Sequence, residues 1–212
     1  MNFDDSGSLK FKVNRYREMQ KMVPGIEALY MLIRSILSTL REARVLVVGC
    51  GGGRELQALD GLGHEVVGVD PSERMLDMAR PYAKGARLVR GTVDDITGDF
   101  DAALSILVMH FLDDKLAYLR AIRQRLRTGA LLLLADVNGD PAVLEAFIGP
   151  FEFHARDRGV DDDAITASAE VIKSLPIITE EQTIDLFAEA GFRLVSPFFR
   201  GLWYAAWWCE AL

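Results

Sequence analysis

The chain has 212 residues, half of them hydrophobic, and a formal net charge of −7 at pH 7. This length suits one domain with a sizeable core and a small appended segment. The acidic balance argues against strong non-specific binding to nucleic acid, which needs a basic face, but it leaves a localised RNA site open. The two cysteines, Cys50 and Cys209, provide neither a disulfide framework nor a metal-ligand spacing.

We therefore expect a reduced, cytoplasmic protein that holds no metal. The N-terminal sequence MNFDDSGSLKFK lacks the apolar run of a signal peptide. No segment approaches the roughly 18 apolar residues of a membrane-spanning helix. Residues 1–22 are largely polar and are expected to form an N-terminal arm. From this arm, Tyr16 or Arg17 could close over a ligand, or could lie on a solvated helix face.

The first regular elements follow Pro24 and Gly25. Apolar residues recur at helical spacing over 26–40, which predicts a helix packed on a sheet. The run VLVV at 45–48 predicts a fully buried strand. Five small residues follow this strand: Gly49, Cys50, Gly51, Gly52 and Gly53.

A strand, a glycine turn and a helix over about 53–61 begin a βαβ unit that binds a nucleotide-like ligand above the turn. Glycines let the backbone approach the ligand, and the helix start offers free N–H groups. The spacing is G-x-G-x-G, at Gly49, Gly51 and Gly53. A dinucleotide-binding turn would need glycine in place of Arg54, so a nicotinamide-dependent dehydrogenase is disfavoured. An ordinary tight turn is the alternative.

The segment HEVVGVD predicts a second strand that ends at Asp70. An acidic residue about 20 positions past a glycine turn is placed to accept hydrogen bonds from two ribose hydroxyls, because a carboxylate has two acceptor oxygens. Alternatively, Asp70 caps the turn at Pro71. Ser72 is a candidate N-cap for the next helix, which has Met75 on its inner side.

A third strand over 86–90 leads into Thr92, Val93 and Asp94. We expect this loop to lie beside an adenine ring. The backbone N–H groups of Thr92 and Val93 could then meet ring nitrogens. The Thr92 hydroxyl or the Asp94 carboxylate could meet the exocyclic amine. A plain turn is the alternative for each residue.

A fourth strand is predicted to end at Ser105 and Ile106, at the switch-point crevice of the sheet. His110 follows closely, but a lone histidine here is more often a packed, hydrogen-bonded neighbour than a base. An amphipathic helix is predicted over 113–127 and should stop at Thr128 and Gly129. A fifth buried strand over 130–137 follows, ending near Asp136.

Residues 138–176 predict a helical insert after strand five, where a substrate lid would lie. It carries His154, which is either a general base or part of a solvated face. Thr179 is a plausible N-cap of a further helix. The chain should close with a β-hairpin rich in aromatic residues, namely Trp203, Tyr204, Trp207 and Trp208. These aromatics should cover the sheet or a homodimer interface, with nucleic-acid stacking as the minority interpretation.

This succession of elements resembles the class I S-adenosylmethionine-dependent methyltransferase family. The matching pieces are VLVVGCGGG, VVGVDPSERML, FDAALSILVMHFL and LRTGALLLLADV. The resemblance covers 23–212 as one domain. It implies a Rossmann-like α/β fold, with a seven-stranded, mostly parallel sheet, helices on both faces and a C-terminal antiparallel hairpin. It also implies S-adenosylmethionine as the cofactor.

At finer grain the chain is similar to the carboxy-S-adenosylmethionine synthase group, often labelled tRNA wobble-uridine methyltransferase-like. The similar pieces are VPG at 23–25, VMHFLDD, the helical insert and the ending ITEEQTIDLFAEAGFRLVSPFFRGLWYAA. Two positions depart from the patterns. Val47 stands where the broad family usually has an acidic residue. Glu170 stands where the synthase group has an arginine for the cofactor's extra carboxylate, which favours ordinary S-adenosylmethionine.

The expected function is methyl transfer to a small-molecule acceptor. A tRNA-modifying enzyme and a non-catalytic cofactor-binding protein are the alternatives, and no catalytic base is assigned. The cofactor-binding residues expected from these motifs are Gly49, Cys50, Gly51, Gly53, Asp70, Pro71, Met75, Thr92, Val93, Asp94, Ser105 and Ile106.

Overall fold

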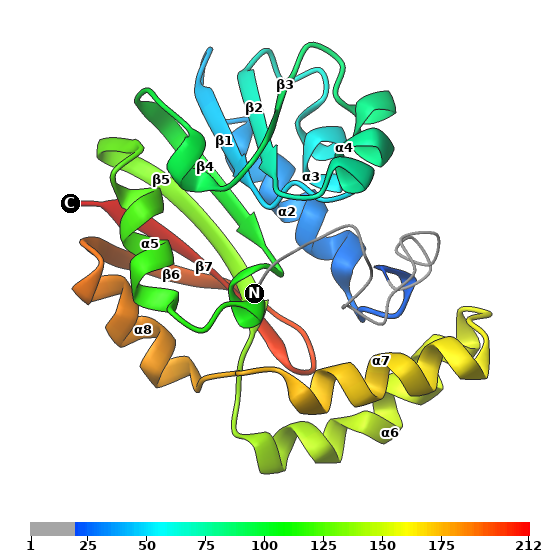
Figure 1. Ribbon diagram of the computed structural model, residues 1–212. Helices are drawn as coiled ribbons and strands as arrows, with labels where there is room; N and C mark the ends of the chain where they lie inside the picture. The colour runs from blue at the N-terminus through cyan, green and yellow to red at the C-terminus, as the bar shows by residue number, and fades with distance from the viewer. Residues whose placement is uncertain (1–19) are drawn as a thin grey trace.

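The computed structural model describes residues 20–212, apart from the side chains of 141–143. Seven strands form one sheet in the order β3-β2-β1-β4-β5-β7-β6 (Figure 1). Strands β1 to β5 are parallel, and β7 runs antiparallel to both β5 and β6. The strands are β1 (Arg44–Val48), β2 (Glu65–Asp70), β3 (Arg87–Arg90), β4 (Phe100–Ile106), β5 (Leu126–Val137), β6 (Phe192–Arg200) and β7 (Tyr204–Ala211). This topology confirms the predicted fold class.

Helices cover both faces of the sheet (Figure 1). The described α-helices are α2 (Ile26–Leu37), α3 (Arg54–Leu59), α4 (Glu73–Ala79), α5 (Lys115–Arg123), α6 (Pro141–Asp157), α7 (Asp162–Ser174) and α8 (Glu180–Glu189). Three short 3₁₀ helices are η2 (Arg80–Tyr82), η3 (Val93–Asp95) and η4 (Met109–Phe111). The N-terminal arm, including Tyr16 and Arg17, lies outside the described residues. No described helix combines the length and apolarity needed to cross a membrane.

The apolar run of β1 is buried on both faces of the sheet. Val45 and Val47 belong to the core that includes α2 and α3, whereas Leu46 and Val48 belong to the core that includes α5 and α8. Successive side chains of a strand point to opposite faces, so a strand covered on both sides needs apolar residues at every position. This is why β1 shows an unbroken run of apolar residues.

The boundary between α5 and β5 differs from the prediction. The helix ends at Arg123, and β5 already begins at Leu126. Thr128 and Gly129, expected to stop the helix, instead lie within the strand. Gly129 has φ 81°, so it interrupts the regular strand conformation before the buried part of β5 begins.

The C-terminal hairpin lies within the sheet, because β7 pairs with β5 on one side and β6 on the other. Trp207 is fully buried, as are Trp203 and Tyr204 to within a few per cent, and Trp208 is partly buried. The Tyr204 hydroxyl donates a 2.8 Å hydrogen bond to the Pro24 carbonyl next to α2. These aromatics therefore build the core and offer no support for a dimer interface.

The predicted insert forms the helical pair α6 and α7. Asp161 caps α7 by accepting a 2.9 Å hydrogen bond from the Ala164 N–H. Phe151 of α6 packs edge-on against Trp203, with ring centroids 5.0 Å apart. The pair crosses the end of the molecule reached by the carboxyl ends of β4 and β5 (Figure 1). It is therefore anchored to the sheet at the end where ligands bind in open α/β folds.

We predict that Thr179→Ala lowers the free energy of unfolding by about 1 kcal/mol. Thr179 Oγ1 accepts from the Gln182 N–H at 3.1 Å, and the Gln182 side chain accepts from the Thr179 N–H at 2.9 Å. The alanine variant loses half of this capping box. Urea unfolding of Thr179→Ser, which keeps the hydroxyl, is the control. Equal stability of the alanine variant and the wild type would contradict the prediction.

Candidate functional site

The glycine turn adopts a backbone conformation that other residues disfavour. Gly49, Gly51 and Gly53 have φ of 67°, 46° and 89°. A Cβ at Gly53 would lie 2.9 Å from the Ala79 Cα, and one at Gly49 would lie 2.5 Å from a Val108 methyl. Glycine is therefore required at both positions by conformation and by space.

The turn is tied back to β2 by hydrogen bonds. The N–H groups of Gly49 and Cys50 both donate to the Val69 carbonyl, at 2.8 and 3.0 Å. The Gly53 N–H donates to the Cys50 carbonyl at 2.9 Å. The Cys50 side chain is fully buried and faces Gly68. Burial raises the pKa of its thiol well above the usual range, so Cys50 is a packing residue here.

Asp70 joins the glycine turn to the turn after β2. Its Oδ2 accepts from the Gly51 N–H and its Oδ1 from the Ser72 N–H, both at 2.9 Å. Burial raises the pKa of this carboxyl, while the two N–H donors act in the opposite direction. The capping role considered for Asp70 is thus confirmed. Each oxygen keeps a further acceptor site, so the same carboxylate is also able to receive ribose hydroxyls.

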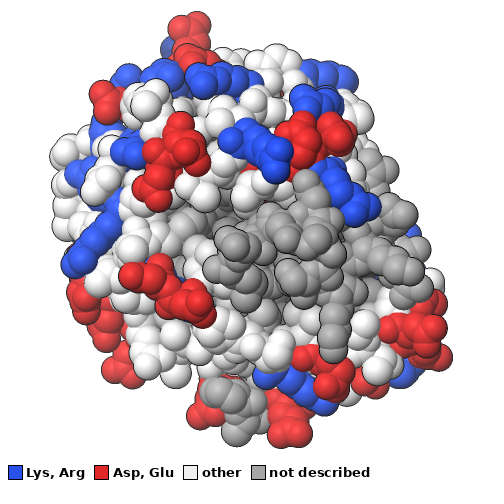
Figure 2. Space-filling view, viewed as in Figure 1, with Lys and Arg blue, Asp and Glu red and all other residues white. Residues whose placement is uncertain are grey.

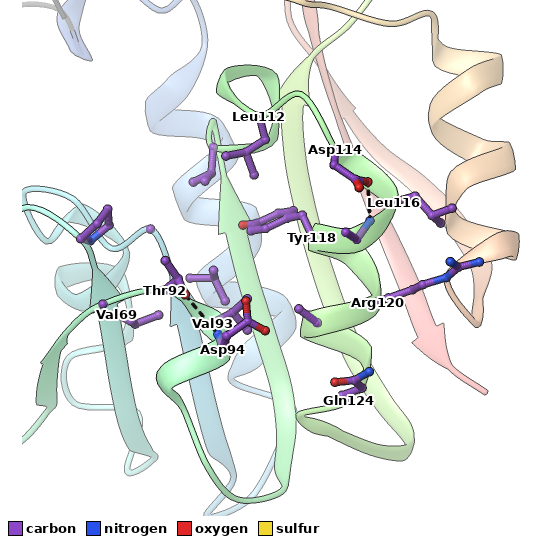
Figure 3. A pocket seen from close by; sticks show the side chains of 17 residues that line it. Val69, Thr92, Val93, Asp94, Leu112, Asp114, Leu116, Tyr118, Arg120 and Gln124 are labelled. Carbon is purple, nitrogen blue, oxygen red and sulfur yellow. Dashed lines mark hydrogen bonds between the residues drawn. The ribbon is translucent and has the colours of Figure 1, made fainter. Parts of the chain in front are cut away.

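A cavity of about 800 Å³ opens beside this turn. It is bounded by the ends of β1 and β2, the loop after β3, and α5 (Figure 3). Five of the residues predicted to bind the cofactor line it, namely Gly49, Pro71, Thr92, Val93 and Asp94. The other predicted residues, Cys50, Gly51, Gly53, Asp70, Met75, Ser105 and Ile106, are not among those that line this cavity.

The loop that holds Thr92 and Asp94 is fixed by a capping box. The Thr92 N–H donates to the Asp95 carboxylate at 2.8 Å, and the Thr92 hydroxyl accepts from the Asp94 N–H at 3.3 Å. Arg125 adds hydrogen bonds to the carbonyls of Val93 and Asp94, both at 3.3 Å. The Thr92 N–H, expected to meet an adenine nitrogen, is thus already engaged. The Asp94 carboxylate lies at the cavity (Figure 3).

Sequence reasoning missed the wall that α5 and the residues just before it contribute. Leu112, Asp114, Tyr118 and Arg120 line the cavity opposite the Thr92 loop (Figure 3). The Tyr118 hydroxyl is 2.8 Å from the Ser105 Oγ, which explains how the buried Ser105 side chain is satisfied. A helical spacing could have revealed that this side of the helix also faces the cavity. It is the spacing of four and three residues between Ala117, Ala121 and Gln124. The apolar pattern revealed only the core face.

His110 is buried, and its Nδ1 is hydrogen-bonded to Asp136 Oδ1. The packed, hydrogen-bonded state favoured by the sequence is therefore confirmed. His154 lies on α6 and is partly buried. The described residues contain no group of three or more His, Cys, Asp or Glu side chains arranged to hold a metal ion.

A buried carboxyl follows the glycine turn directly. Glu55 of α3 is 4% exposed and accepts a 2.6 Å hydrogen bond from the Tyr30 hydroxyl of α2. Burial raises the pKa of Glu55 from 4.5 to about 7, against the opposing effects of the Tyr30 hydrogen bond and of Arg54. Arg54 also lies over the Tyr30 ring, 4.8 Å from its centroid. This contact joins α2 to the start of α3.

Glu55 predicts a specific pH dependence of stability. A carboxyl whose pKa is raised on folding favours the folded state fully below the unfolded value of 4.5, and this contribution is lost as the pH rises to about 7. The change is about 3 kcal/mol. The free energy of unfolding is measured with urea at pH 5 and at pH 8. We expect it to fall between these two pH values in the wild type, and we expect Glu55→Gln to lack this decrease. Glu65→Gln, at an exposed position, is the control. An unchanged pH dependence in Glu55→Gln would refute the assignment.

Comparisons with known proteins bear on this site. Residues 46–134 match the sequence family described as a methyltransferase domain. This part of the chain is therefore similar to a methyltransferase domain. The matched segment begins at Leu46 in β1, includes the glycine turn and ends at Leu134 in β5.

Two curated relatives are ubiquinone biosynthesis O-methyltransferases. The protein from Ruegeria pomeroyi is 31% identical over 161 residues, which cover 72% of this chain and 60% of the relative. The protein from Cereibacter sphaeroides is 34% identical over 105 residues, covering 46% and 42%. The chain thus spans about two to three fifths of the length of these relatives.

Two solved structures share the fold. The 1,6-didemethyltoxoflavin-N1-methyltransferase of Burkholderia thailandensis, with bound S-adenosylhomocysteine, superimposes with a TM-score of 0.65 at 21% identity, covering 94% of this chain and 84% of that one. The magnesium protoporphyrin IX methyltransferase of Synechocystis, also with bound S-adenosylhomocysteine, gives 0.68 at 16% identity, covering 92% and 87%. The methyltransferase fold thus extends over nearly the whole chain.

Proposed function

We propose that this chain is an S-adenosylmethionine-dependent methyltransferase that acts on a small molecule. The observation that carries the proposal is the position of Asp70. Its carboxylate lies at the carboxyl end of β2, bonded to the glycine turn, next to a cavity of about 800 Å³. An acidic residue at this point is suited to hold a ribose. The domain match and the fold support the same cofactor.

The residues present fit this cofactor. Asp70 would receive the ribose hydroxyls, and Val93 and Asp94 would lie beside the adenine. Gly49, Gly51 and Gly53 would allow the close approach of the backbone, with Cys50, Pro71, Met75 and Thr92 completing the turns around it. Ser105 and Ile106, at the end of β4, would lie at the methionine end. Residues 23–212 would form the catalytic domain, with 138–176 as a lid over the acceptor.

S-adenosylmethionine supplies a methyl group that its sulfonium already makes electrophilic. The protein's task is therefore to align the acceptor with the methyl–sulfur bond and to exclude water. The cavity wall contributed by Leu112, Leu116 and Tyr118 provides apolar surface for this exclusion. No redox group or metal is required by such a transfer.

A small-molecule acceptor is favoured by the surface and by the relatives. Lys and Arg side chains are interspersed with Asp and Glu on the described part of the face shown in Figure 2. The described part of this face therefore lacks a continuous basic patch, which is typical of RNA-binding surfaces. The curated relatives are O-methyltransferases of ubiquinone biosynthesis, and one structural neighbour is an N-methyltransferase of a small heterocycle.

Ordinary S-adenosylmethionine is preferred to its carboxylated form. Glu170, expected by alignment where an arginine would hold the extra carboxylate, lies exposed on α7 and pairs with Lys173 at 3.2 Å. Glu170 is therefore a surface residue of α7, paired with another residue of the same helix. The finer resemblance to the carboxy-S-adenosylmethionine synthase group is therefore the less favoured version of the proposal.

Calorimetric titration with S-adenosylmethionine, with NADH as the comparison ligand, tests the proposal. We expect micromolar binding of S-adenosylmethionine alone. Asp70→Asn should weaken it about 10- to 100-fold, because charge-assisted hydrogen bonds to the ribose are lost. Asp77→Asn, an exposed carboxyl on α4, is the matched control.

Circular dichroism must show that each variant is folded, since Asp70 also holds the glycine turn. Absence of S-adenosylmethionine binding by the folded wild type would refute the proposed function. Equal binding of S-adenosylmethionine by Asp70→Asn and the wild type would refute only the role given to Asp70 and would leave the proposed function standing.

A further inference from the structure

The connection between β3 and β4 leaves part of the sheet without a covering helix. It spans residues 91–99 and contains only the 3₁₀ helix η3, although β2 and β1 separate β3 from β4 in the sheet. Crossovers between parallel strands usually carry an α-helix that packs on the sheet. Here Val48 of β1 and Val69 of β2 line the cavity instead, on the face of the sheet that α5 covers. The cavity therefore lies where a helix of this connection would pack.

The cavity continues along α5, away from the carboxyl ends of the strands. Ala117, Ala121 and Gln124 line it, with Gln124 farthest from the strand ends (Figure 3). At a rise of about 1.5 Å per residue, these positions extend roughly 10 Å along the helix. Two of the three side chains are alanines, which fill little of the space in front of the helix. We call the part of the cavity between these three residues and η3 the α5 groove.

The loop opposite α5 offers the cavity one carboxylate. The N–H and the hydroxyl of Thr92 both donate to Asp95 Oδ2, at 2.8 and 3.3 Å, and the hydroxyl also accepts from the Asp94 N–H. The polar groups of Thr92 are thus engaged within the loop. The Asp94 carboxylate is instead directed across the cavity toward α5 (Figure 3). A carboxylate only accepts hydrogen bonds, so it suits the exocyclic amine of adenine, which donates them.

This contact determines where the rest of the amine points. The amine and the ribose lie at opposite ends of adenine, so a ribose held at Asp70 directs the amine away from the glycine turn. The amine nitrogen, N6, carries two hydrogens, and Asp94 receives one of them. A group that replaces the other hydrogen would enter the α5 groove. Val93, Ala117 and Ala121 provide apolar surface for it there.

We propose that the α5 groove is a second subsite of the cofactor site, which receives an apolar substituent on N6 of adenine. The inference rests on the proposed function. The ligands of this subsite are S-adenosyl compounds that carry one alkyl or benzyl group on N6. A single substituent leaves one N–H for Asp94, whereas two substituents leave none. The cavity therefore accepts N6-monosubstituted compounds and discriminates against N6-disubstituted ones.

Ala121 is the position at which the groove can be closed. It lies between the other two groove residues on the helix, and a leucine there would occupy the space assigned to the substituent. Leucine is a good helix former, so α5 keeps its local preference for helix. Ala188→Leu is the matched control, because Ala188 is an exposed alanine of another helix, α8, and does not line the cavity.

The test measures binding by calorimetry, which needs no knowledge of the methyl acceptor. The ligands are S-adenosylhomocysteine and its N6-methyl, N6-benzyl and N6,N6-dimethyl derivatives. The proteins are the wild type, Ala121→Leu and Ala188→Leu, each shown to be folded by circular dichroism. The readout is the ratio of the affinities for the N6-benzyl and the unsubstituted compound within each protein. An effect of a variant on the shared adenosine site cancels in this ratio.

We expect the wild type to bind the N6-benzyl derivative about 10-fold more tightly than S-adenosylhomocysteine, because the groove buries much of the benzyl group. The gain stays below that of full burial, since Ala117 and Gln124 are exposed and leave the groove open on one side. Ala121→Leu should reverse the preference, and Ala188→Leu should keep it. The N6,N6-dimethyl derivative should bind about 10-fold more weakly than the N6-methyl one, because its amine cannot donate to Asp94.

The wild-type ligand series decides the matter even if Ala121→Leu does not fold. An N6-benzyl derivative that the wild type binds no more tightly than S-adenosylhomocysteine would refute the subsite and leave the proposed function standing. A preference that persists in folded Ala121→Leu would place the substituent outside the groove and would also refute it. Equal binding of the N6-methyl and N6,N6-dimethyl derivatives would refute the orientation set by Asp94. Failure of the wild type to bind S-adenosylhomocysteine at all would instead refute the proposed function.

Discussion

The bridge made by the Asp70 carboxylate is the interaction on which the site depends. One oxygen holds the Gly51 N–H and the other the Ser72 N–H, so two turns at neighbouring strand ends become one unit. Without it, the glycine turn would be tied to β2 only through the Val69 carbonyl. The Asp70 carboxylate can be buried here because both of its oxygens are hydrogen-bonded. The same group remains able to accept from a ligand, which links local stability to binding.

The sheet order places everything else around that bridge. Because β1 has β2 on one side and β4 on the other, the chain must leave the sheet in opposite directions at this point. The Thr92 loop and α5 then face each other across the cavity. The His110–Asp136 pair lies on the β4–β5 side, away from Asp70.

Strand β1 and the second part of β5 were predictable because their burial on both faces requires an unbroken run of apolar residues. The glycine turn and Asp70 were predictable because backbone conformation and charge restrict those positions to few residue types. The end of α5 was mispredicted because Thr128 and Gly129 mimic a helix stop while lying in a strand. The cavity wall on α5 was missed because the apolar pattern does not show which residues, such as Leu116 and Ala117, face a cavity and which face the core.

The polar pairs could not be predicted from local sequence. His110 and Asp136 are 26 residues apart, and Tyr30 and Glu55 are 25 apart, so only the sheet and the α2–α3 packing bring them together. The local sequence around His110 does not show that its ring is hydrogen-bonded to a carboxylate. Likewise, Glu55 looks like an ordinary residue of a helix first turn until its burial is known.

A crystal structure of the complex with S-adenosylhomocysteine is the most direct test of the account. We expect the ribose hydroxyls on the Asp70 carboxylate, the adenine beside Val93 and Asp94, and the sulfur directed toward the end of β4. A ligand bound elsewhere, or a ribose that leaves Asp70 untouched, would contradict the central claim that the Asp70 bridge organises the cofactor site.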